Sequence, residues 1–312
     1  MFKVLLTSTS FQDSPGAHHS LLNQQGYHVE TRRGPLKESE IMEVIDQYDA
    51  VLCGDDELTR RVLEKGKQGR LKVVSKYGVG LDKIDIKAAK DLNIPVMNCP
   101  GVNQVSVAEH VFALLLTYFR NVHLEYNYFK KGKWNRMTGT ELHGKTIGII
   151  GLGAIGKEVA KRARCFGMHV LVYDTIPDLS FIKENELVSM ADLKELFIYS
   201  DIISLHIPLT PLTAEIINKT VINEQLKRGV VLVNTSRGKL VNLNDLINGL
   251  TNGIVGGYLA DVLDVEPMPL NYPLVYLENV IVTPHIGSRT TESIEKQGVL
   301  SVKNLLYMLN NT

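Results

Sequence analysis

Three side chains of complementary chemistry follow apolar runs in the second half of the chain: Arg237, Glu266 and His285. An imidazole exchanges a proton near neutral pH, so His285 suits a proton donor in carbonyl reduction and an acceptor in the reverse oxidation. A carboxylate beside it, here Glu266, would favour the imidazolium and hold the ring in one orientation. The planar guanidinium of Arg237 suits a substrate carboxylate and polarises the adjacent carbonyl. The set predicts hydride transfer at C2 of a small 2-hydroxy or 2-oxo acid.

Each of these residues also has a purely structural interpretation. His285 would then be a solvated loop histidine, Glu266 an exposed acid before a proline, and Arg237 a cation that anchors a loop. Singly, the two interpretations are about equally good, but three complementary groups at strand ends favour chemistry. His206 is a rival base without a nearby candidate carboxylate, so we assign it to the cofactor cleft. His110 fits a structural role and a functional one equally well.

The segment 151–156 has the glycine pattern of a dinucleotide-binding turn between an apolar strand and a helix. Gly151 permits the tight turn, Gly153 lets backbone approach the pyrophosphate, and Gly156 lets helix and strand pack closely. The helix N-terminus adds free amides and the positive end of the helix dipole for the phosphates. Glycine turns also join strands to helices for structural reasons, so the pattern depends on its context.

That context is present in the residues that follow the turn. A second strand, 170–173, ends in Asp174, whose carboxylate is suited to the two ribose hydroxyls. The next residues, 175–177, include no arginine to balance a 2′-phosphate. We therefore expect a dinucleotide site, and we expect NAD rather than NADP.

Short β-branched runs alternate with helical patterns throughout the chain, which is typical of parallel α/β architecture. A first series of strands is expected at 3–7, 28–31, 50–53, 72–75 and 96–98. A second series is expected at 146–150, 169–173, 202–206, 230–234, 255–260 and 280–283. Long helices are expected over 105–129 and over 290–309.

The last helix follows the second series without a strand of its own, so we expect it to return to the first domain. The first domain is then discontinuous, with residues 1–99 and 287–312, and the second comprises 100–286. The predicted fold is α/β with two Rossmann-like domains, each a parallel sheet with helices on both faces. Ligands in such folds lie at the carboxyl ends of the strands, where the candidate residues are found.

Composition narrows the function further. The chain has 34 basic and 34 acidic residues and a formal charge of zero, which indicates no general affinity for nucleic acid or membranes. Its three cysteines contain no Cys-x-x-Cys pair, so they fit a reducing cytosol and neither a disulfide framework nor a zinc site. The longest apolar run, 111–119, is too short to span a bilayer. We expect a cytoplasmic protein without a metal.

Several of these stretches closely resemble the D-isomer-specific 2-hydroxyacid dehydrogenases. They are 151–156 with Asp174, 234–238, and 261–267 with 284–288. The resemblance covers nearly the whole chain and implies a homodimer whose subunits each have a cofactor domain and a substrate domain, with catalysis in the cleft between them. In that family the residues that match Arg237, Glu266 and His285 are the catalytic set. Further cofactor contacts are then expected at Ala154, Ile155, His206, Pro208, Thr213, Thr235, Ser236, Asp261 and Gly287.

The first domain carries the resemblance too. The segment 75–82 is similar to the loop whose backbone amides bind the substrate carboxylate, here at Val79 and Gly80. The segment 98–103 resembles the hinge, and its last residue, Asn103, is a further expected substrate contact. Glu266 argues against formate dehydrogenase, in which the corresponding partner is glutamine.

Within the family, the segment 131–145 is most like phosphoglycerate dehydrogenases. Lys76 falls where those enzymes commonly carry a basic residue near the substrate phosphate, and Arg136 is a second candidate cation. We therefore expect 3-phosphoglycerate and 3-phosphohydroxypyruvate as substrates, although both cations are also consistent with ordinary solvated side chains. Alternatives are a glyoxylate or hydroxypyruvate reductase and, in a different class, a nicotinamide-sensing corepressor. Arg289 is unusual for the family and suits either the cleft or the cap of the last helix.

Overall fold

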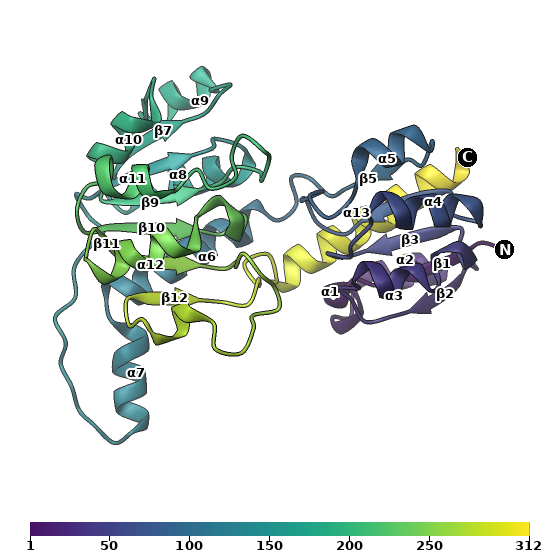
Figure 1. Cartoon of the computed structure of the whole chain (residues 1–312), viewed down its shortest axis with the longest axis horizontal. Coiled ribbons are helices and arrows are strands. Elements are labelled where there is room, and N and C mark those ends of the chain that lie inside the picture. The colour runs from purple at the N-terminus through teal and green to yellow at the C-terminus, as the bar shows by residue number, and fades with distance from the viewer. Residues whose placement is uncertain (312) are drawn as a thin grey trace. The chain divides into compact units, whose positions relative to one another are not determined.

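A computed structural model describes residues 1–311 of the chain. The backbone divides into two compact units (Figure 1). The first contains Met1–Asn103 and the chain from Arg289 onward, and the second contains Gln104–Ser288. Each unit has its own parallel sheet flanked by helices, which confirms the predicted fold class.

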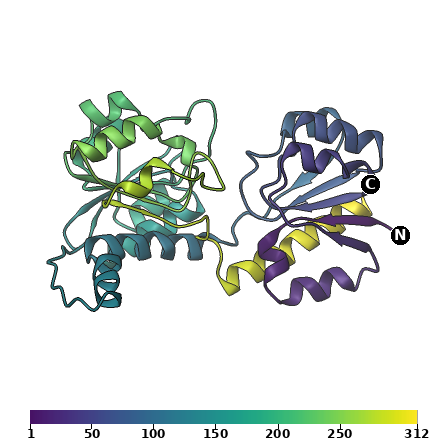
Figure 2. The same cartoon turned by 60° about the horizontal axis from the view of Figure 1, so that its bottom comes forward.

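The first unit is built on a five-stranded parallel sheet in the order β2-β1-β3-β4-β5. Its strands are β1 (Lys3–Leu6), β2 (His28–Thr31), β3 (Ala50–Cys53), β4 (Val73–Lys76) and β5 (Val96–Met97). Its helices are α1 (Thr9–Asp13), α2 (Ala17–Asn23), α3 (Glu38–Met42), α4 (Arg60–Gln68), α5 (Ile86–Asp91) and α13 (Thr291–Asn310). One apolar cluster joins the sheet to α1, α2 and α13, and another joins it to α3, α4 and α5. The last helix, α13, drawn in yellow, packs against β3 and β4 (Figure 2).

The second unit is built on a seven-stranded parallel sheet in the order β12-β11-β10-β9-β6-β7-β8. Its strands are β6 (Thr146–Ile150), β7 (His169–Tyr173), β8 (Val188–Ser189), β9 (Ile202–Leu205), β10 (Val230–Asn234), β11 (Val255–Ala260) and β12 (Val280–Val282). Its helices are α6 (Gln104–Phe119), α7 (Val122–Lys130), α8 (Ala154–Cys165), α9 (Leu179–Glu184), α10 (Leu193–Tyr199), α11 (Lys219–Glu224) and α12 (Leu243–Thr251). Apolar clusters join the sheet to α6, α8 and α9, and to α10, α11 and α12.

The central strands of this sheet are mostly apolar because helices cover both of their faces. Every residue of β9 and of β10 is buried. The register aligns Asn234 with Ala260, and Ala260 with Val282, at the carboxyl ends of β10, β11 and β12. The segments that carry the three candidate catalytic residues therefore leave one edge of the sheet side by side.

The prediction of one long helix over 105–129 is wrong. The structure has two helices there, α6 and α7, and the backbone between them turns at Asn121, which has a left-handed φ of 54°. Asparagine adopts this conformation more readily than most residues, and it ends the first helix because it cannot continue a right-handed one. The strand β8 was not predicted, because it has only two residues and both are exposed.

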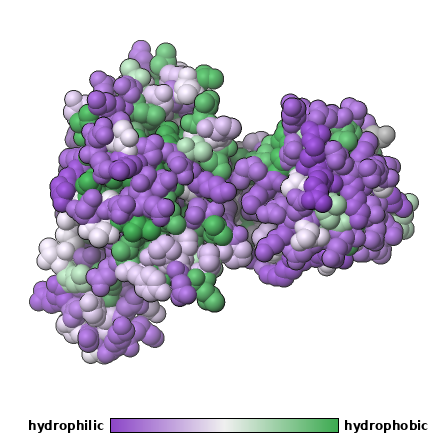
Figure 3. Space-filling model, viewed as in Figure 1, coloured by the Kyte–Doolittle hydropathy of each residue, from purple (hydrophilic) through white to green (hydrophobic). Residues whose placement is uncertain are grey.

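The surface in Figure 3 is mostly hydrophilic, with separate apolar patches. Within residues 1–311, no helix has the length and apolar character needed to cross a membrane. The described side chains also include no group of three or more histidine, cysteine or acidic residues arranged to hold a metal ion.

Candidate active site

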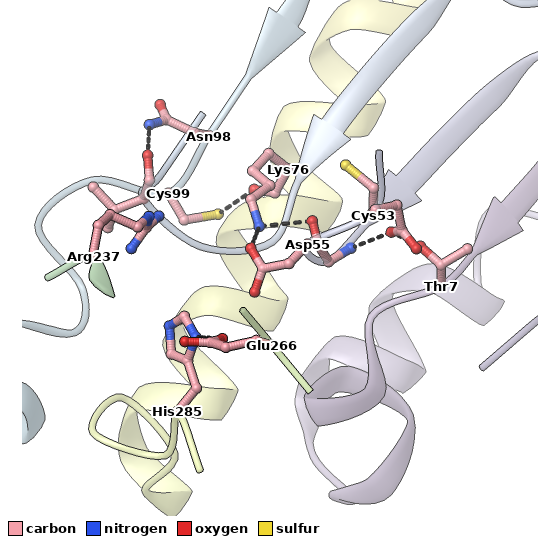
Figure 4. A network of polar contacts seen from close by, with 12 residues as sticks. Thr7, Cys53, Asp55, Lys76, Asn98, Cys99, Arg237, Glu266 and His285 are labelled. Atoms are coloured by element: carbon pink, nitrogen blue, oxygen red, sulfur yellow. Dashed lines mark hydrogen bonds and ion pairs between the residues drawn. The ribbon is translucent and has the colours of Figure 1, made fainter. Parts of the chain in front are cut away.

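His285 and Glu266 form a direct pair, which Figure 4 shows from close by. The Nδ1 atom of His285 lies 2.8 Å from Oε2 of Glu266. The other carboxylate oxygen, Oε1, accepts a hydrogen bond of 2.8 Å from the backbone amide of Leu263. Both side chains are about one third exposed, at 35% and 36%. The carboxylate is thus held by its own loop while it orients the imidazole, so Nε2 is on the opposite side of the ring from Glu266.

The loop that carries Arg237 is held by the side chain at the end of β10. The Asn234 Nδ2 atom donates to the backbone oxygen of Arg237 at 2.9 Å and lies 3.2 Å from the Tyr258 hydroxyl. Its Oδ1 atom accepts from the amide of Ser236 at 3.1 Å. Asn234 is fully buried, so these bonds satisfy polar atoms that water does not reach.

The loops of Arg237 and Glu266 also pack directly against each other. A Cβ atom built on Gly238 would lie 2.0 Å from the carbonyl carbon of Leu263 and 2.2 Å from the amide nitrogen of Asp264. Only glycine allows this approach, which brings the guanidinium loop and the carboxylate loop together in the second unit. The structure thus places all three predicted catalytic residues on one sheet edge.

The buried carboxylate of Asp261 stabilises the backbone segment that carries His285. Asp261 is 3% exposed, and its carboxylate accepts bonds from the Thr283 hydroxyl at 2.6 Å and from the amides of Ile286 and Gly287 at 2.9 and 2.6 Å. Burial raises its pKa, but His110, Thr283 and the two amides outweigh this and lower the pKa below its ordinary value. Asp261, which was predicted to contact the cofactor, therefore anchors the His285 segment.

His110 belongs to this support. Its Nε2 atom lies 2.8 Å from the Thr283 hydroxyl and 3.4 Å from Asp261 Oδ1. The sequence left its role open because nothing local links residue 110 to a strand end more than 150 positions later. Its place on the amphipathic helix next to Glu109 was the only signal, and it was too weak to decide.

The glycine turn has the geometry that a dinucleotide needs. Gly151 has a φ of 96°, and a Cβ atom there would lie 2.5 Å from the His206 carbonyl oxygen. At Gly156 a Cβ atom would lie 2.0 Å from the Gly151 backbone oxygen, so the first turn of α8 packs directly against the glycine turn. At Gly153 a Cβ atom would meet nothing within 4 Å, which leaves space beside the first turn of α8. Ala154 and Ile155 form that first turn.

The carboxylate of Asp174 braces the same turn. It accepts a hydrogen bond of 2.7 Å from the amide of Leu152 and one of 2.9 Å from the amide of Ile176. A carboxylate has about four acceptor sites, so these two bonds leave capacity for ribose hydroxyls. Asp174 therefore connects the end of β7 to the glycine turn.

Two buried polar atoms at the neighbouring strand ends have no hydrogen-bond partner within the described chain: His206 Nδ1 and Thr235 Oγ1. Buried polar atoms are nearly always paired, so two unpaired atoms directly after β9 and β10 fit a polar ligand at this edge of the sheet. The other ring nitrogen of His206 lies 2.8 Å from the Ser204 hydroxyl. Burial lowers the pKa of His206 to about 4, which keeps the ring neutral. The residues around the turn thus fit a dinucleotide.

Two other residues predicted to contact the cofactor, Thr213 and Ser236, form hydrogen bonds between their hydroxyl groups and the protein backbone. The Thr213 hydroxyl donates to the Pro208 carbonyl at 2.6 Å, and it also accepts from the Thr210 amide at 2.8 Å. The Ser236 hydroxyl donates to the Leu205 carbonyl at 2.7 Å. These bonds shape the loops after β9 and β10.

The first unit holds the residues predicted to contact the substrate. Lys76 is the last residue of β4, and its ammonium lies 2.7 Å from both the Gly54 carbonyl oxygen and Asp55 Oδ1. Val79 is exposed on the loop that follows, and its carbonyl oxygen accepts from Asn98 Nδ2 at 2.6 Å. Gly80 lies beside it on this loop, and Asn103 is the residue before α6.

Arg136 lies elsewhere in its own unit. It is an exposed residue on the segment after α7, and this segment returns to the end of α6, where the Thr140 amide donates to the Phe119 carbonyl at 2.8 Å. Phe119 lines a hollow with Asp201 and Gly229, which immediately precede β9 and β10. This is the amino edge of the sheet, opposite the edge of His285. Within the second unit, the structure does not bring Arg136 to the candidate catalytic residues.

Residues 112–287 match the sequence model described as "D-isomer specific 2-hydroxyacid dehydrogenase, NAD binding domain". The chain belongs to the D-isomer-specific 2-hydroxyacid dehydrogenases. The matched region contains the glycine turn, Asp174 and the three side chains at the carboxyl edge. The cofactor of this dehydrogenase is NAD, as predicted.

Similar proteins include enzymes with different substrates in their names. A hydroxypyruvate reductase from Thermotoga maritima is 38% identical over 93% of both chains. A D-3-phosphoglycerate dehydrogenase from Methanocaldococcus jannaschii is 36% identical over 99% of this chain, which spans 58% of that relative. The crystal structure of a D-lactate dehydrogenase from Aquifex aeolicus, complexed with NAD and lactic acid, has a TM-score of 0.86 and 31% identity, over 99% of this chain and 96% of that one. The likeness to enzymes does not favour the corepressor alternative.

Proposed function

We propose that this dehydrogenase interconverts a small D-2-hydroxy acid and its 2-oxo acid, with Arg237, Glu266 and His285 as its catalytic residues. The observation that carries the proposal is the His285–Glu266 pair at 2.8 Å on the same sheet edge as Arg237. An acid–base group with an orienting carboxylate, on the same sheet edge as a guanidinium, matches the needs of carbonyl reduction.

In reduction, His285 donates a proton to the C2 oxygen, and in oxidation it takes that proton back. Bound NADH supplies the hydride for reduction, and NAD+ accepts it in the reverse reaction. Glu266 favours the imidazolium and holds the ring so that Nε2 is the donating atom. Charge develops on the C2 oxygen during reduction, and Arg237 stabilises it electrostatically.

The proposal assigns each unit a candidate group for the substrate carboxylate. Arg237 provides a planar fork of N–H donors, which matches a carboxylate better than a single ammonium does. The backbone amides of Val79 and Gly80, on the exposed loop after β4, provide the second set of donors.

The sequence favours 3-phosphohydroxypyruvate as the 2-oxo acid, and a similar protein is named D-3-phosphoglycerate dehydrogenase. Hydroxypyruvate or glyoxylate is the second candidate, because other similar proteins are named for these acids. One structural observation supports the second candidate: Lys76, the cation expected to bind the phosphate, is already paired with Asp55.

The test is NADH oxidation by the purified protein with 3-phosphohydroxypyruvate, hydroxypyruvate, glyoxylate and pyruvate, repeated with NADPH. We expect turnover with at least one acid, the D-enantiomer as product, and a preference for NADH. NADH binding without turnover of any 2-oxo acid would contradict the proposal and support a sensor instead.

Homodimer formation and a cytoplasmic location are further parts of the proposal. Helix α7 exposes Val122, Tyr126 and Phe129, at 53%, 60% and 62%, on one face. Apolar patches of this kind often mark interfaces between subunits. The three cysteines are free thiols, which suits a reducing compartment.

A further inference from the structure

An ion pair between Asp55 and Lys76 lies at the carboxyl edge of the first sheet. It is next to the loop of Val79 and Gly80, which is proposed to bind the substrate. The strands β3 and β4 are neighbours, with Cys53 opposite Lys76 in the register. Asp55 follows β3, and its Oδ1 atom lies 2.7 Å from Lys76 Nζ (Figure 4). A Cβ atom built on Gly78 would lie 3.6 Å from the same nitrogen. The ammonium therefore lies against the turn that leads to Val79 and Gly80.

The two partners differ sharply in exposure. The Lys76 side chain is 4% exposed, whereas Asp55 is 50% exposed. A buried ammonium needs compensation, and here it receives a carboxylate and the Gly54 carbonyl oxygen. The pair therefore presents a carboxylate, rather than a lysine cation, to solvent at this edge.

The placement of Asp55 is built into the fold by its neighbour. The side chain of Asp56 points inward, where it accepts bonds from the Gly54 amide at 2.9 Å and the Leu36 amide at 2.6 Å. It also accepts from the Thr7 hydroxyl, and it is fully buried. These bonds hold the segment after β3 so that Asp55 reaches Lys76.

We propose that Asp55 is a specificity-determining residue that selects 2-oxo acids with an uncharged polar substituent at C3 and rejects phosphorylated ones. The inference rests on the proposed function, and it replaces the phosphorylated substrate that the sequence favours. A phosphate dianion at this edge would meet a like charge and would have to compete with Asp55 for the ammonium. A C3 hydroxyl can donate to the carboxylate while the substrate carboxylate is bound by the loop amides. Hydroxypyruvate has this chemistry.

The experiment compares kcat/KM for hydroxypyruvate and for 3-phosphohydroxypyruvate in the wild-type protein and in Asp55→Asn. The wild-type protein should prefer hydroxypyruvate. Asp55→Asn keeps an acceptor for Lys76 but removes the charge, so the ratio should move toward the phosphorylated acid by roughly tenfold or more. Asp55→Glu, which restores the charge, should restore the preference.

Glu57→Gln is the matched control, because it removes a nearby carboxylate that pairs with Lys83 at 3.7 Å. Its ratio should equal that of the wild type. Thermal unfolding of each variant, compared with wild type, shows whether the first unit, which contains Asp55 and Glu57, is folded. High ionic strength should also narrow the wild-type preference, since screening weakens the repulsion of the dianion; this measurement needs no variant.

Three results would overturn the inference: a wild-type preference for 3-phosphohydroxypyruvate, an unchanged ratio in Asp55→Asn, or an equal loss for both acids in that variant. Failure of the proposed function looks different, because then the wild-type protein would turn over neither acid nor any other in the panel.

Discussion

His285 has a left-handed backbone, with a φ of 56°. For a residue with a Cβ atom this conformation costs roughly 1–2 kcal/mol, so the surroundings must impose it. They do so through the backbone amide of His285, which donates hydrogen bonds to the carbonyl oxygens of Asp261 and Thr283 at 2.9 and 3.0 Å. The strained backbone directs the imidazole toward Glu266. The hydrogen bonds of the His285 amide offset the conformational cost of the left-handed backbone.

Replacing Glu266 with Gln tests this pair. The carboxylate favours the protonated ring, which is the form that donates a proton in reduction. The rate of Glu266→Gln should therefore fall further below wild type as pH rises, while His285→Ala should be deficient throughout. The measurement is kcat/KM for 2-oxo acid reduction across the pH range, and an unchanged profile in Glu266→Gln would count against the pairing.

Replacing Arg237 with Lys tests the carboxylate clamp. Lysine keeps the charge but loses the planar fork, so kcat/KM should fall at least tenfold, which is about 1.4 kcal/mol of transition-state stabilisation. NADH affinity should change little and serves as the control. Wild-type kinetics in Arg237→Lys would show that the guanidinium does not hold the substrate.

His206 predicts a pH dependence of stability. Burial lowers its pKa from 6.5 to about 4 in the folded chain. Between these values the unfolded chain binds the proton and the folded chain does not, so this stability is present above pH 6.5 and is lost as pH falls toward 4. The loss of unfolding free energy over this pH range is on the order of 3 kcal/mol. In urea unfolding from pH 7 to pH 4.5, His206→Gln should lose less stability than wild type, and parallel curves would refute this role.

At the scale of elements, the glycines of the turn between β6 and α8 differ in role: one allows close packing, and another leaves space beside the helix. Gly156 serves the contact of helix and strand, because a Cβ atom there would lie 2.0 Å from the Gly151 oxygen. Gly153 has no such packing contact, because a Cβ atom there would meet nothing within 4 Å, and we propose that it lets the dinucleotide approach the backbone. One sequence motif then contains a packing position and a proposed binding position.

Alanine at each position should separate these functions. Gly153→Ala should retain the thermal midpoint of wild type and weaken NADH binding by tenfold or more, because the methyl group occupies the approach of the pyrophosphate. Gly156→Ala should lose both stability and binding, with overpacking costing about 1–3 kcal/mol. Thermal unfolding and fluorescence titration with NADH measure the two effects. Wild-type affinity in Gly153→Ala would remove the pyrophosphate from this turn.

At the scale of the whole molecule, helix α7 is an element without a buried residue. Its exposed apolar face is costly in water unless another surface covers it. In the proposed homodimer, a surface of the second subunit covers this face of α7.

Phe129→Asp should therefore convert a dimer into a monomer, which light scattering after size exclusion would show as a halved mass. Leu179→Asp is the control, because Leu179 is similarly exposed, at 68%, on α9. It should leave the mass unchanged. A monomeric wild-type protein would contradict the prediction.

The sequence by itself determined the two parallel sheets, the dinucleotide turn and the three candidate catalytic residues. These follow from local patterns: alternation of strands and helices, a glycine spacing, and polar residues directly after apolar runs. Because parallel strands end on one edge, the order of the elements was sufficient to bring Arg237, Glu266 and His285 to that edge.

The tertiary structure decided the partners of those residues. The contact between His110 and Asp261 joins α6 to the end of β11. The ion pair between Lys76 and Asp55 joins the ends of β4 and β3. The structure also showed that the segment following Arg136 reaches the amino edge of its sheet at Thr140, opposite the edge of His285. Such contacts depend on strand register and on which helix covers which face, so they arise from packing between distant segments rather than from local sequence patterns.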